Sequence, residues 1–243
     1  MYKEFLETDQ RPFPIRNNHW VMTQVWKQLL FCHWPVPADL LKEYIPPQLE
    51  LDVFDGQAWL GIIPFQVEDM RLRGLPQLPY LSTYLELNVR TYVTYKGTPG
   101  IYFFNLDANK WMDVLGARIF AFLPYRKASM KMEVKGQHTC FQSNYNQNEL
   151  LDIVYHPVSE PILPSKSSLE FWLFERYCFY TPMGKSIFRG DIHHDRWRVR
   201  KAEAEVRKNT IVPFIPETYK ERPPLLHFSD KKQVFVWMLK QVK

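Results

Sequence analysis

The sequence predicts a mainly β domain of the α+β class, in which short strands are accompanied by about three short helices. The chain holds 19 prolines but only 9 glycines, a balance that favours corners and short strands over long helices. Residues 84–95 alternate between two sets of side chains with the period of two that is typical of a strand. The length of 243 residues suits a single β-rich barrel or sandwich. We therefore expect residues 1–243 to form one domain.

The first half of the chain contains a series of predicted elements separated by turn residues and prolines. In order, these are a helix or strand within 17–31, a helix at 39–44, two strands within 51–67 around an Asp55-Gly56 turn, a loop at 71–80, strands at 84–95 and 101–106, and a helix at 109–122 that Asn109 caps and Pro124 follows.

The second half is again predicted to be rich in strands. Strands are expected at 129–135 and 139–142, followed by a long polar connection over 143–166. Ser167 and Glu170 have the spacing of a capping box and predict a short helix at 169–176. The remaining predicted strands are 178–181, 187–193, 197–206 and 234–238.

Charge and cysteine usage exclude several classes of protein. The net charge is +5, and the densest basic stretch, 196–208, is interrupted by Glu203 and Glu205. No clustered positive surface is predicted, so we expect no nucleic-acid partner. The 3 cysteines are far apart, which implies no disulfide framework and fits a reducing compartment. With neither a signal peptide nor a stretch of membrane-span length in the sequence, we expect a soluble, cytoplasmic protein without a membrane partner.

Arg118 is the most informative single residue. On the predicted helix 109–122 it shares one face with three apolar side chains, namely Trp111, Leu115 and Phe122. An arginine buried on an apolar face needs a carboxylate or a polar cavity. The strand before this helix carries a candidate carboxylate, Glu86, with Asn88 and Arg90 on the same face.

Periodicity leaves two interpretations of this pattern open. In the first, Glu86, Asn88 and Arg90 form the solvent-exposed side of an edge strand, and Arg118 extends outward to water. In the second, the sheet curls so that its polar face lines a cavity, where the arginines hold an anionic group of a ligand. The aromatic content of 16% suits either a thick core or an aromatic-lined cavity.

Segments spread over nearly the whole chain add a family resemblance. They are His33-Trp34-Pro35-Val36-Pro37, Phe54-Asp55-Gly56, Pro64-Phe65, Arg71-Leu72-Arg73-Gly74-Leu75-Pro76, Glu86-Leu87-Asn88-Val89-Arg90, Gly100-Ile101-Tyr102-Phe103-Phe104, Ala117-Arg118, Leu123-Pro124-Tyr125, Glu175-Arg176-Tyr177 and His193-His194. With these segments the chain resembles the YqjF-like family of bacterial proteins, which is related to the acetoacetate-decarboxylase-like fold. The resemblance implies a closed, cone-like antiparallel β-barrel with an internal cavity and a few short helices packed outside. It favours the interpretation in which the polar face lines a cavity.

The decarboxylases use a lysine Schiff base, and this chain departs from that pattern. The matching run is 122–127, where the resemblance places Tyr125 and Arg126 at the two lysine positions. Neither side chain forms an imine with a ketone. Lys127 lies two residues beyond Tyr125, on the same side of a strand, and would substitute if the register shifts. The resemblance gives Glu86 an acid–base role and leaves open whether the protein is an enzyme.

Three functions are therefore weighed. The leading one is a pocket for a small anionic or carbonyl-bearing molecule; the alternatives are a lyase using Lys127 and a non-catalytic binder of aromatic or hydrophobic compounds. The catalytic candidates are Glu86, Arg118, Tyr125 and Lys127, and the ligand-binding candidates are Asn88, Arg90, Arg73 and His193.

No cofactor or metal is expected. The chain contains no nucleotide fingerprint, and adjacent residues of a strand such as His193 and His194 point to opposite faces. The sequence does not decide between a monomer and a homo-oligomer.

Overall fold

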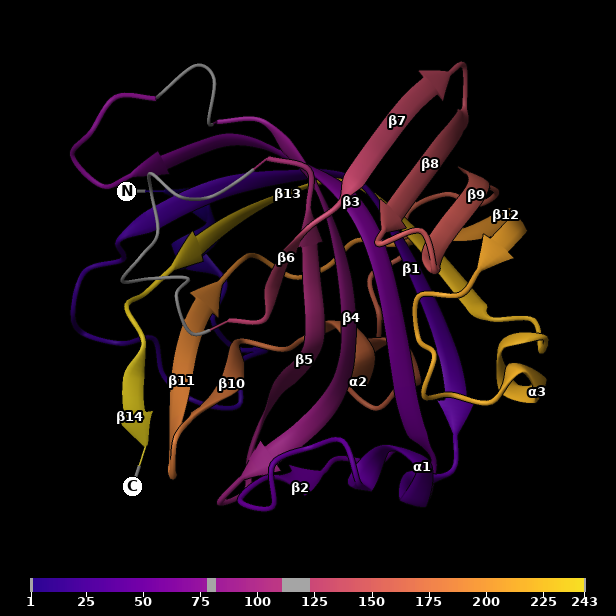
Figure 1. Ribbon diagram of the computed structural model, residues 1–243. Helices are drawn as coiled ribbons and strands as arrows, with labels where there is room; N and C mark the ends of the chain where they lie inside the picture. Colours follow the sequence, from indigo (N-terminus) through magenta and orange to yellow (C-terminus); the bar gives the residue numbers. More distant parts are fainter. Residues whose placement is uncertain (1, 78–81, 111–122, 243) are drawn as a thin grey trace.

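The computed structural model describes residues 2–77, 82–110 and 123–242. It contains long curved strands and a few short helices (Figure 1). The elements are η1 Lys3–Leu6, β1 Met22–Val36, α1 Ala38–Lys42, β2 Glu50–Leu51, β3 Ala58–Leu72, β4 Tyr84–Tyr95, β5 Thr98–Ala108, β6 Tyr125–Lys127, β7 Ser129–Lys135, β8 His138–Tyr145, β9 Glu149–Pro157, α2 Leu169–Phe174, β10 Cys178–Met183, β11 Ser186–His193, β12 Arg200–Asn209, α3 Glu217–Lys220, β13 Leu225–Val236 and β14 Lys240–Val242.

The strands of the described residues form one 14-stranded sheet. Its order is β14-β11-β10-β5-β4-β3-β1-β13-β12-β9-β8-β7, with β2 beside β4 and β6 beside β5. β11 makes a further pairing with β13 through Ile192 and Val236, and through His193 and Phe235. Most pairings are antiparallel, but β10 and β6 each run parallel to β5. The sheet is therefore mainly antiparallel, as expected, with two parallel pairings that the sequence did not predict.

The long strands bend at residues that interrupt the regular ladder. The register of the β1–β3 pair shifts in the stretch from Lys27 to Cys32. This stretch contains Gln28, whose φ is 52°. Such a bulge increases the local twist of a strand. In Figure 1, β1, β3 and β4 curve across the molecule, and the β7–β8 hairpin projects from it.

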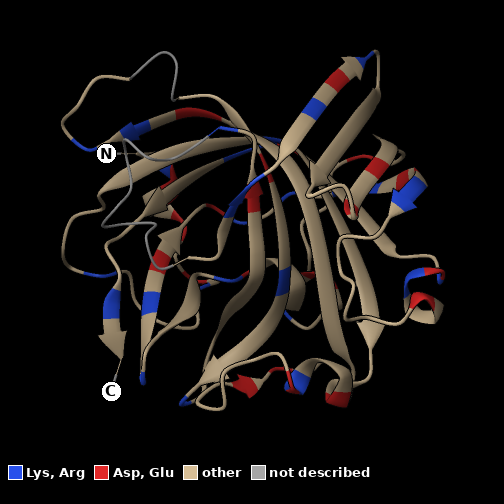
Figure 2. Ribbon diagram, in the orientation of Figure 1, with Lys and Arg blue, Asp and Glu red and all other residues tan. Residues whose placement is uncertain are grey.

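Both faces of the central strands are buried, because successive side chains point to opposite sides. On β1, Leu29 and Phe31 belong to one hydrophobic cluster, whereas Leu30, Cys32 and Trp34 belong to another on the opposite face. Burial on both faces accounts for the nearly continuous apolar runs in these strands. Charged side chains of both signs lie on the peripheral elements β7, α1 and α3 (Figure 2), and a smaller set is buried, including Glu86, Arg90 and Arg176.

Several predicted elements are found in place. The prediction of a strand at 84–95 is confirmed by β4, and that at 129–135 by β7. The segment 17–31, left open as helix or strand, enters β1, which continues through Trp34 to Val36. Within the described residues, no helix is long and apolar enough to cross a membrane. The predicted helix 109–122 lies outside the described residues from 111 onward.

Other predictions were wrong in informative ways. The Asp55-Gly56 turn forms, with positive φ at both residues, but it does not join two paired strands, since β2 pairs with β4 rather than β3. The predicted connection 143–166 contains β9. The cap of α2 is Ser168 rather than Ser167, because the Ser168 side chain accepts a hydrogen bond from the amide of Phe171.

Candidate functional site

A cavity of about 80 Å³ lies among β1, β4, β5, β10, β11 and β13. This space holds several water molecules or a small organic molecule. Most of its lining is apolar, including the aromatic rings of Trp26, Phe103, Phe174, Phe179, Trp197 and Trp237. The polar lining includes Gln24, Glu86, Asn88, Arg90, Tyr125 and Arg176. An apolar pocket with a few convergent polar groups is the usual form of a small-molecule site.

β4 carries three of these polar groups on one face. Glu86, Asn88 and Arg90 alternate along the strand and are all buried. Opposite Arg90 in the register stands Gly61 of β3. A Cβ at Gly61 would lie 3.2 Å from the Arg90 Cγ atom, so the glycine leaves room for the arginine stem. The period-two pattern of the sequence thus places these side chains together on the cavity wall.

Arg90 has no carboxylate partner among the described residues. Its Nη2 donates a long hydrogen bond, 3.4 Å, to the Tyr92 hydroxyl, and its Nε has no partner. The guanidinium also lies 5.8 Å from the centre of the Phe31 ring. Only 8% of Arg90 is exposed. A cation that is buried with so few partners is unusual.

Glu86 is surrounded by hydrogen-bond donors rather than by cations. The Tyr125 hydroxyl donates to Glu86 Oε2 over 3.1 Å, and Tyr84 and Asn88 also hydrogen-bond to this carboxyl. Tyr125 reaches it because β6 pairs in parallel with β5, opposite Leu106. Burial raises the pKa of Glu86 to about 7, against the lowering effect of the donors. The carboxyl therefore takes up and releases a proton near neutral pH.

Burial also fixes the protonation of the neighbouring tyrosines. The pKa of Tyr125 is raised well above its usual value by burial and by Glu86, so the phenol stays neutral. Tyr84 is held in the same state for the same reasons. Gln24 donates to the Tyr84 hydroxyl over 3.1 Å and accepts from the Trp26 indole over 2.8 Å. A connected hydrogen-bond network therefore runs from β1 to Glu86.

Arg176 is a lining residue that was not among the site candidates. Its Nη1 lies 2.6 Å from Asp52 Oδ2, its Nε donates to the Trp172 carbonyl over 2.6 Å, and its Nη2 has no partner in the described part of the chain. The Glu175-Arg176-Tyr177 segment of the family resemblance was the one signal that could have pointed to it. Asp52 neutralises this second cation of the cavity.

The two histidines have different surroundings. His193 does not line the cavity; its Nε2 lies 2.8 Å from the Glu4 carbonyl and its Nδ1 lies 3.0 Å from Arg11. The adjacent His194 does line the cavity. A strand places neighbours on opposite faces, and the sequence alone could not tell which of the two points inward.

The remaining predicted site residues lie elsewhere. Lys127 is exposed at the end of β6 and does not line the cavity. Arg73 is also exposed, with its guanidinium 4.8 Å from the centre of the Trp20 ring. Arg118 lies outside the described residues. The structure therefore brings together Glu86, Asn88, Arg90 and Tyr125.

Nucleophilic groups are scarce on the described part of the cavity wall. Cys178 lines the cavity, but burial raises the pKa of its thiol to about 12, so it is not a thiolate near neutral pH. No lysine is among the described lining residues. No group of three His, Cys, Asp or Glu side chains in residues 2–77, 82–110 and 123–242 is arranged to hold a metal ion.

Solved structures show which fold this is. The chain is similar to acetoacetate decarboxylase from Legionella pneumophila, with a TM-score of 0.64, 16% identity and coverage of 96% of this chain and 92% of that one. An acetoacetate decarboxylase-like enzyme from Sphingomonas wittichii RW1 gives a TM-score of 0.63, 9% identity and coverage of 95% and 96%. The enduracididine biosynthesis enzyme MppR complexed with pyruvate gives 0.64, 7% identity and coverage of 93% and 92%. The chain has the acetoacetate-decarboxylase-like fold, as expected.

Sequence comparison identifies the family. Residues 23–233 match the model of DUF2071, described as an uncharacterized conserved protein. The chain is also 42% identical over 234 residues to the uncharacterized protein YqjF of Bacillus subtilis (strain 168), covering 96% of this chain and 97% of that protein. The chain belongs to the DUF2071 family, and its YqjF-like character is confirmed.

Proposed function

We propose that this protein binds a small organic molecule bearing a carboxylate or a carbonyl oxygen in the cavity beside β4. The observation that carries the proposal is the buried guanidinium of Arg90, which faces the cavity without a carboxylate partner in the described part of the chain. Burying a cation is costly unless an anion or good acceptors compensate it. An anionic ligand supplies that compensation, and its carboxylate fits the paired donors of a guanidinium.

The charge balance of the cavity supports an anion. Arg176 is paired with Asp52, and Glu86, whose pKa is raised to about 7, is largely protonated below that pH. Arg90 is then the uncompensated charge of the described lining. In the proposed arrangement Arg90 holds the anionic group, and Tyr125 and Asn88 offer hydrogen bonds. Glu86 exchanges a proton with the ligand or orients it.

The architecture proposed for this site is a closed barrel. The pairing of β11 with β13 joins the two ends of the series β11-β10-β5-β4-β3-β1-β13. A sheet closed in this way leaves its inner face to line a space for one small ligand. The proposal keeps the cone-like barrel that the family resemblance implies, with two parallel pairings included.

An alternative function is a lyase of decarboxylase type. It is favoured by the fold shared with acetoacetate decarboxylase and with MppR, the latter solved with pyruvate. Lys127 is exposed and no described lining residue is a lysine, which favours binding without an imine. Borohydride reduction in the presence of acetoacetate distinguishes the two, since an imine mechanism leaves a mass adduct on a lysine.

The test of the proposal is calorimetric titration with pyruvate, acetoacetate and phenylacetate. We expect at least one of these carboxylates to bind, and Arg90→Met to weaken its binding about tenfold to a hundredfold. Arg73→Met removes an exposed arginine outside the cavity and serves as the matched control. Unchanged affinity in Arg90→Met, or a failure of all three carboxylates to bind the wild-type protein, would contradict the proposal.

A further inference from the structure

His194 lines the same cavity, and one of its two ring nitrogens is not used in a hydrogen bond within the described residues. It is 1% exposed and lines the cavity, and its Nδ1 lies 2.8 Å from the backbone carbonyl of Asp195. A carbonyl oxygen only accepts hydrogen bonds, so Nδ1 carries the proton of the neutral ring and Nε2 carries the lone pair. Nε2 has no partner within the described residues.

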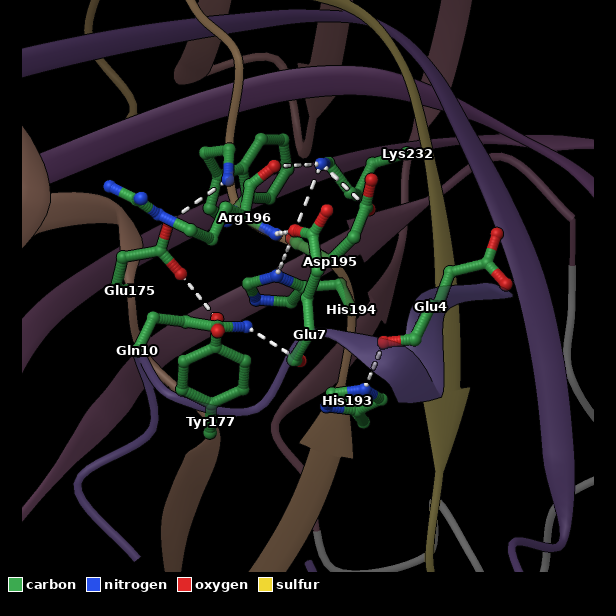
Figure 3. Close-up of polar contacts among 11 residues, drawn as sticks. Glu4, Glu7, Gln10, Glu175, Tyr177, His193, His194, Asp195, Arg196 and Lys232 are labelled. Atoms are coloured by element: carbon green, nitrogen blue, oxygen red, sulfur yellow. Dashed lines mark hydrogen bonds and ion pairs between the residues drawn. The ribbon is translucent and has the colours of Figure 1, made fainter. Parts of the chain in front are cut away.

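A cluster of polar contacts holds His194 in this orientation (Figure 3). Lys232 donates to the Asp195 carboxylate over 2.9 Å and to the carbonyls of Asp195 and Arg196 over 3.3 and 2.8 Å. The Trp197 amide donates to Glu175 Oε1 over 2.9 Å. Asp195, Arg196 and Trp197, the three residues that follow His194, thus each take part in at least one hydrogen bond.

Aromatic packing and charge restrict the ring further. The imidazole stacks on Tyr177 with ring centres 4.5 Å apart and lies 5.2 Å from the Trp197 ring. Burial, followed by the charge of Lys232, keeps the pKa of His194 well below its usual value. A ring that stays neutral and is held by this packing and by the Asp195 carbonyl offers an acceptor for a ligand O–H or N–H group.

The geometry points to a ligand with two polar ends, and we propose that it is a hydroxylated carboxylic acid. Arg90 would bind the carboxylate and His194 Nε2 would accept the hydrogen bond of the hydroxyl group. β4 and β11 are separated in the sheet by β5 and β10, that is by three strand spacings of about 4.8 Å each, so the two groups lie on the order of 10–15 Å apart across the curved sheet. An apolar or aromatic spacer fits the rings between them. The nearby cations Lys232 and Arg11 disfavour an ammonium group in place of the hydroxyl.

This inference rests on the proposed function, and matched ligand pairs separate the two. The probes are phenylacetate with 4-hydroxyphenylacetate, 3-phenylpropionate with 3-(4-hydroxyphenyl)propionate, and hexanoate with 6-hydroxyhexanoate. We expect the hydroxylated member of at least one pair to bind about tenfold more tightly to the wild-type protein. His194→Phe should abolish this preference, so that the two members of each pair bind that variant with equal affinity. His194→Gln retains a hydrogen-bond acceptor and should keep part of the preference for the hydroxylated ligand. The control is the same substitution at another histidine, His156→Phe on β9.

A measurement without substitution covers the case in which a variant does not fold. In protein labelled with ¹⁵N-histidine, the Nε2 resonance of His194 should shift with the hydroxylated probe but not with its plain partner. Carboxylate binding that depends on Arg90, without a hydroxyl preference in any pair or with a preference that survives in His194→Phe, overturns the inference and leaves the proposed function standing. If no carboxylate binds at all, both are wrong.

Discussion

Two opposing effects act on the pKa of Glu86. Three hydrogen-bond donors favour its ionised form, but it is only 6% exposed, and burial raises its pKa from 4.5 to about 7. In the unfolded chain the same group titrates near its ordinary value. Between these two pH values the folded protein holds a proton that the unfolded chain has released, so folding stability falls as pH rises across this window.

Replacing Glu86 by glutamine should remove this pH dependence. A shift of this size corresponds to about 3 kcal/mol of unfolding free energy, lost by the wild-type protein between about pH 4.5 and pH 7. Glu86→Gln should therefore gain stability relative to the wild type as pH rises, up to that amount at pH 8. Urea denaturation at pH 5, 6, 7 and 8 measures the difference. A constant difference across the series would show that Glu86 is not the titrating group, and Glu43→Gln near α1 provides an exposed control.

The Arg176–Asp52 pair gives a second prediction for single residues. Arg176 is 3% exposed at its side chain and Asp52 is 18% exposed. Removing one partner of a buried ion pair leaves an uncompensated charge, which costs about 3–5 kcal/mol. We expect Asp52→Ala to lower the unfolding free energy by about 3 kcal/mol in denaturant titrations. The control is Asp9→Ala, since the Asp9–Lys166 pair is 68% and 60% exposed and its loss should change the unfolding free energy little. Equal losses in both variants would contradict this reasoning.

At the scale of elements, local patterns predict strands and turns better than they predict pairing. The period-two alternation of side chains in the sequence predicted the bounds of β4. It also predicted that Glu86, Asn88 and Arg90 share one face of this strand. The Asp55-Gly56 turn also formed as its residue types favour. Pairing of β2 with β4 instead of β3 depends on tertiary contacts, which no local pattern contains. The sequence also left open which of His193 and His194 points inward, because a shift of one residue exchanges the two faces of a strand.

The contact between β10 and β11 allows a test at this scale. Gly190 pairs directly with Phe179, and a Cβ at Gly190 would overlap the Phe179 ring. Gly190→Ala should therefore displace a ring that lines the cavity and lower the unfolding free energy by about 1–3 kcal/mol. In a Phe179→Ala background the same substitution should cost much less, since the overlap is gone. Additive losses in this double-mutant cycle would show that the ring is not the cause.

For the whole molecule, the sheet order joins distant parts of the chain. β1 pairs with β13 about as far apart in sequence as the chain allows, for example Met22 with Val236. The site depends on this topology, because Gln24 of β1, Arg176 after α2 and His194 after β11 meet around β4. The sequence predicts the polar face of β4 but not its partners, since these come from other strands whose positions follow only from the complete sheet.

The same topology predicts two levels of local stability. β3 and β4 are buried along most of their length, whereas β7 is the last strand in the order of the described residues and its side chains are mostly exposed or half-buried. Amides of β3 and β4 should exchange with deuterium only on global unfolding, and those of the β7–β8 hairpin should exchange at least about a hundredfold faster by local opening. Hydrogen exchange followed by mass spectrometry measures both sets in one experiment. Equal protection of β7 would contradict this gradient. If that protection then weakened on dilution, a second copy of the chain would be covering this edge, because an unpaired strand edge binds another strand readily.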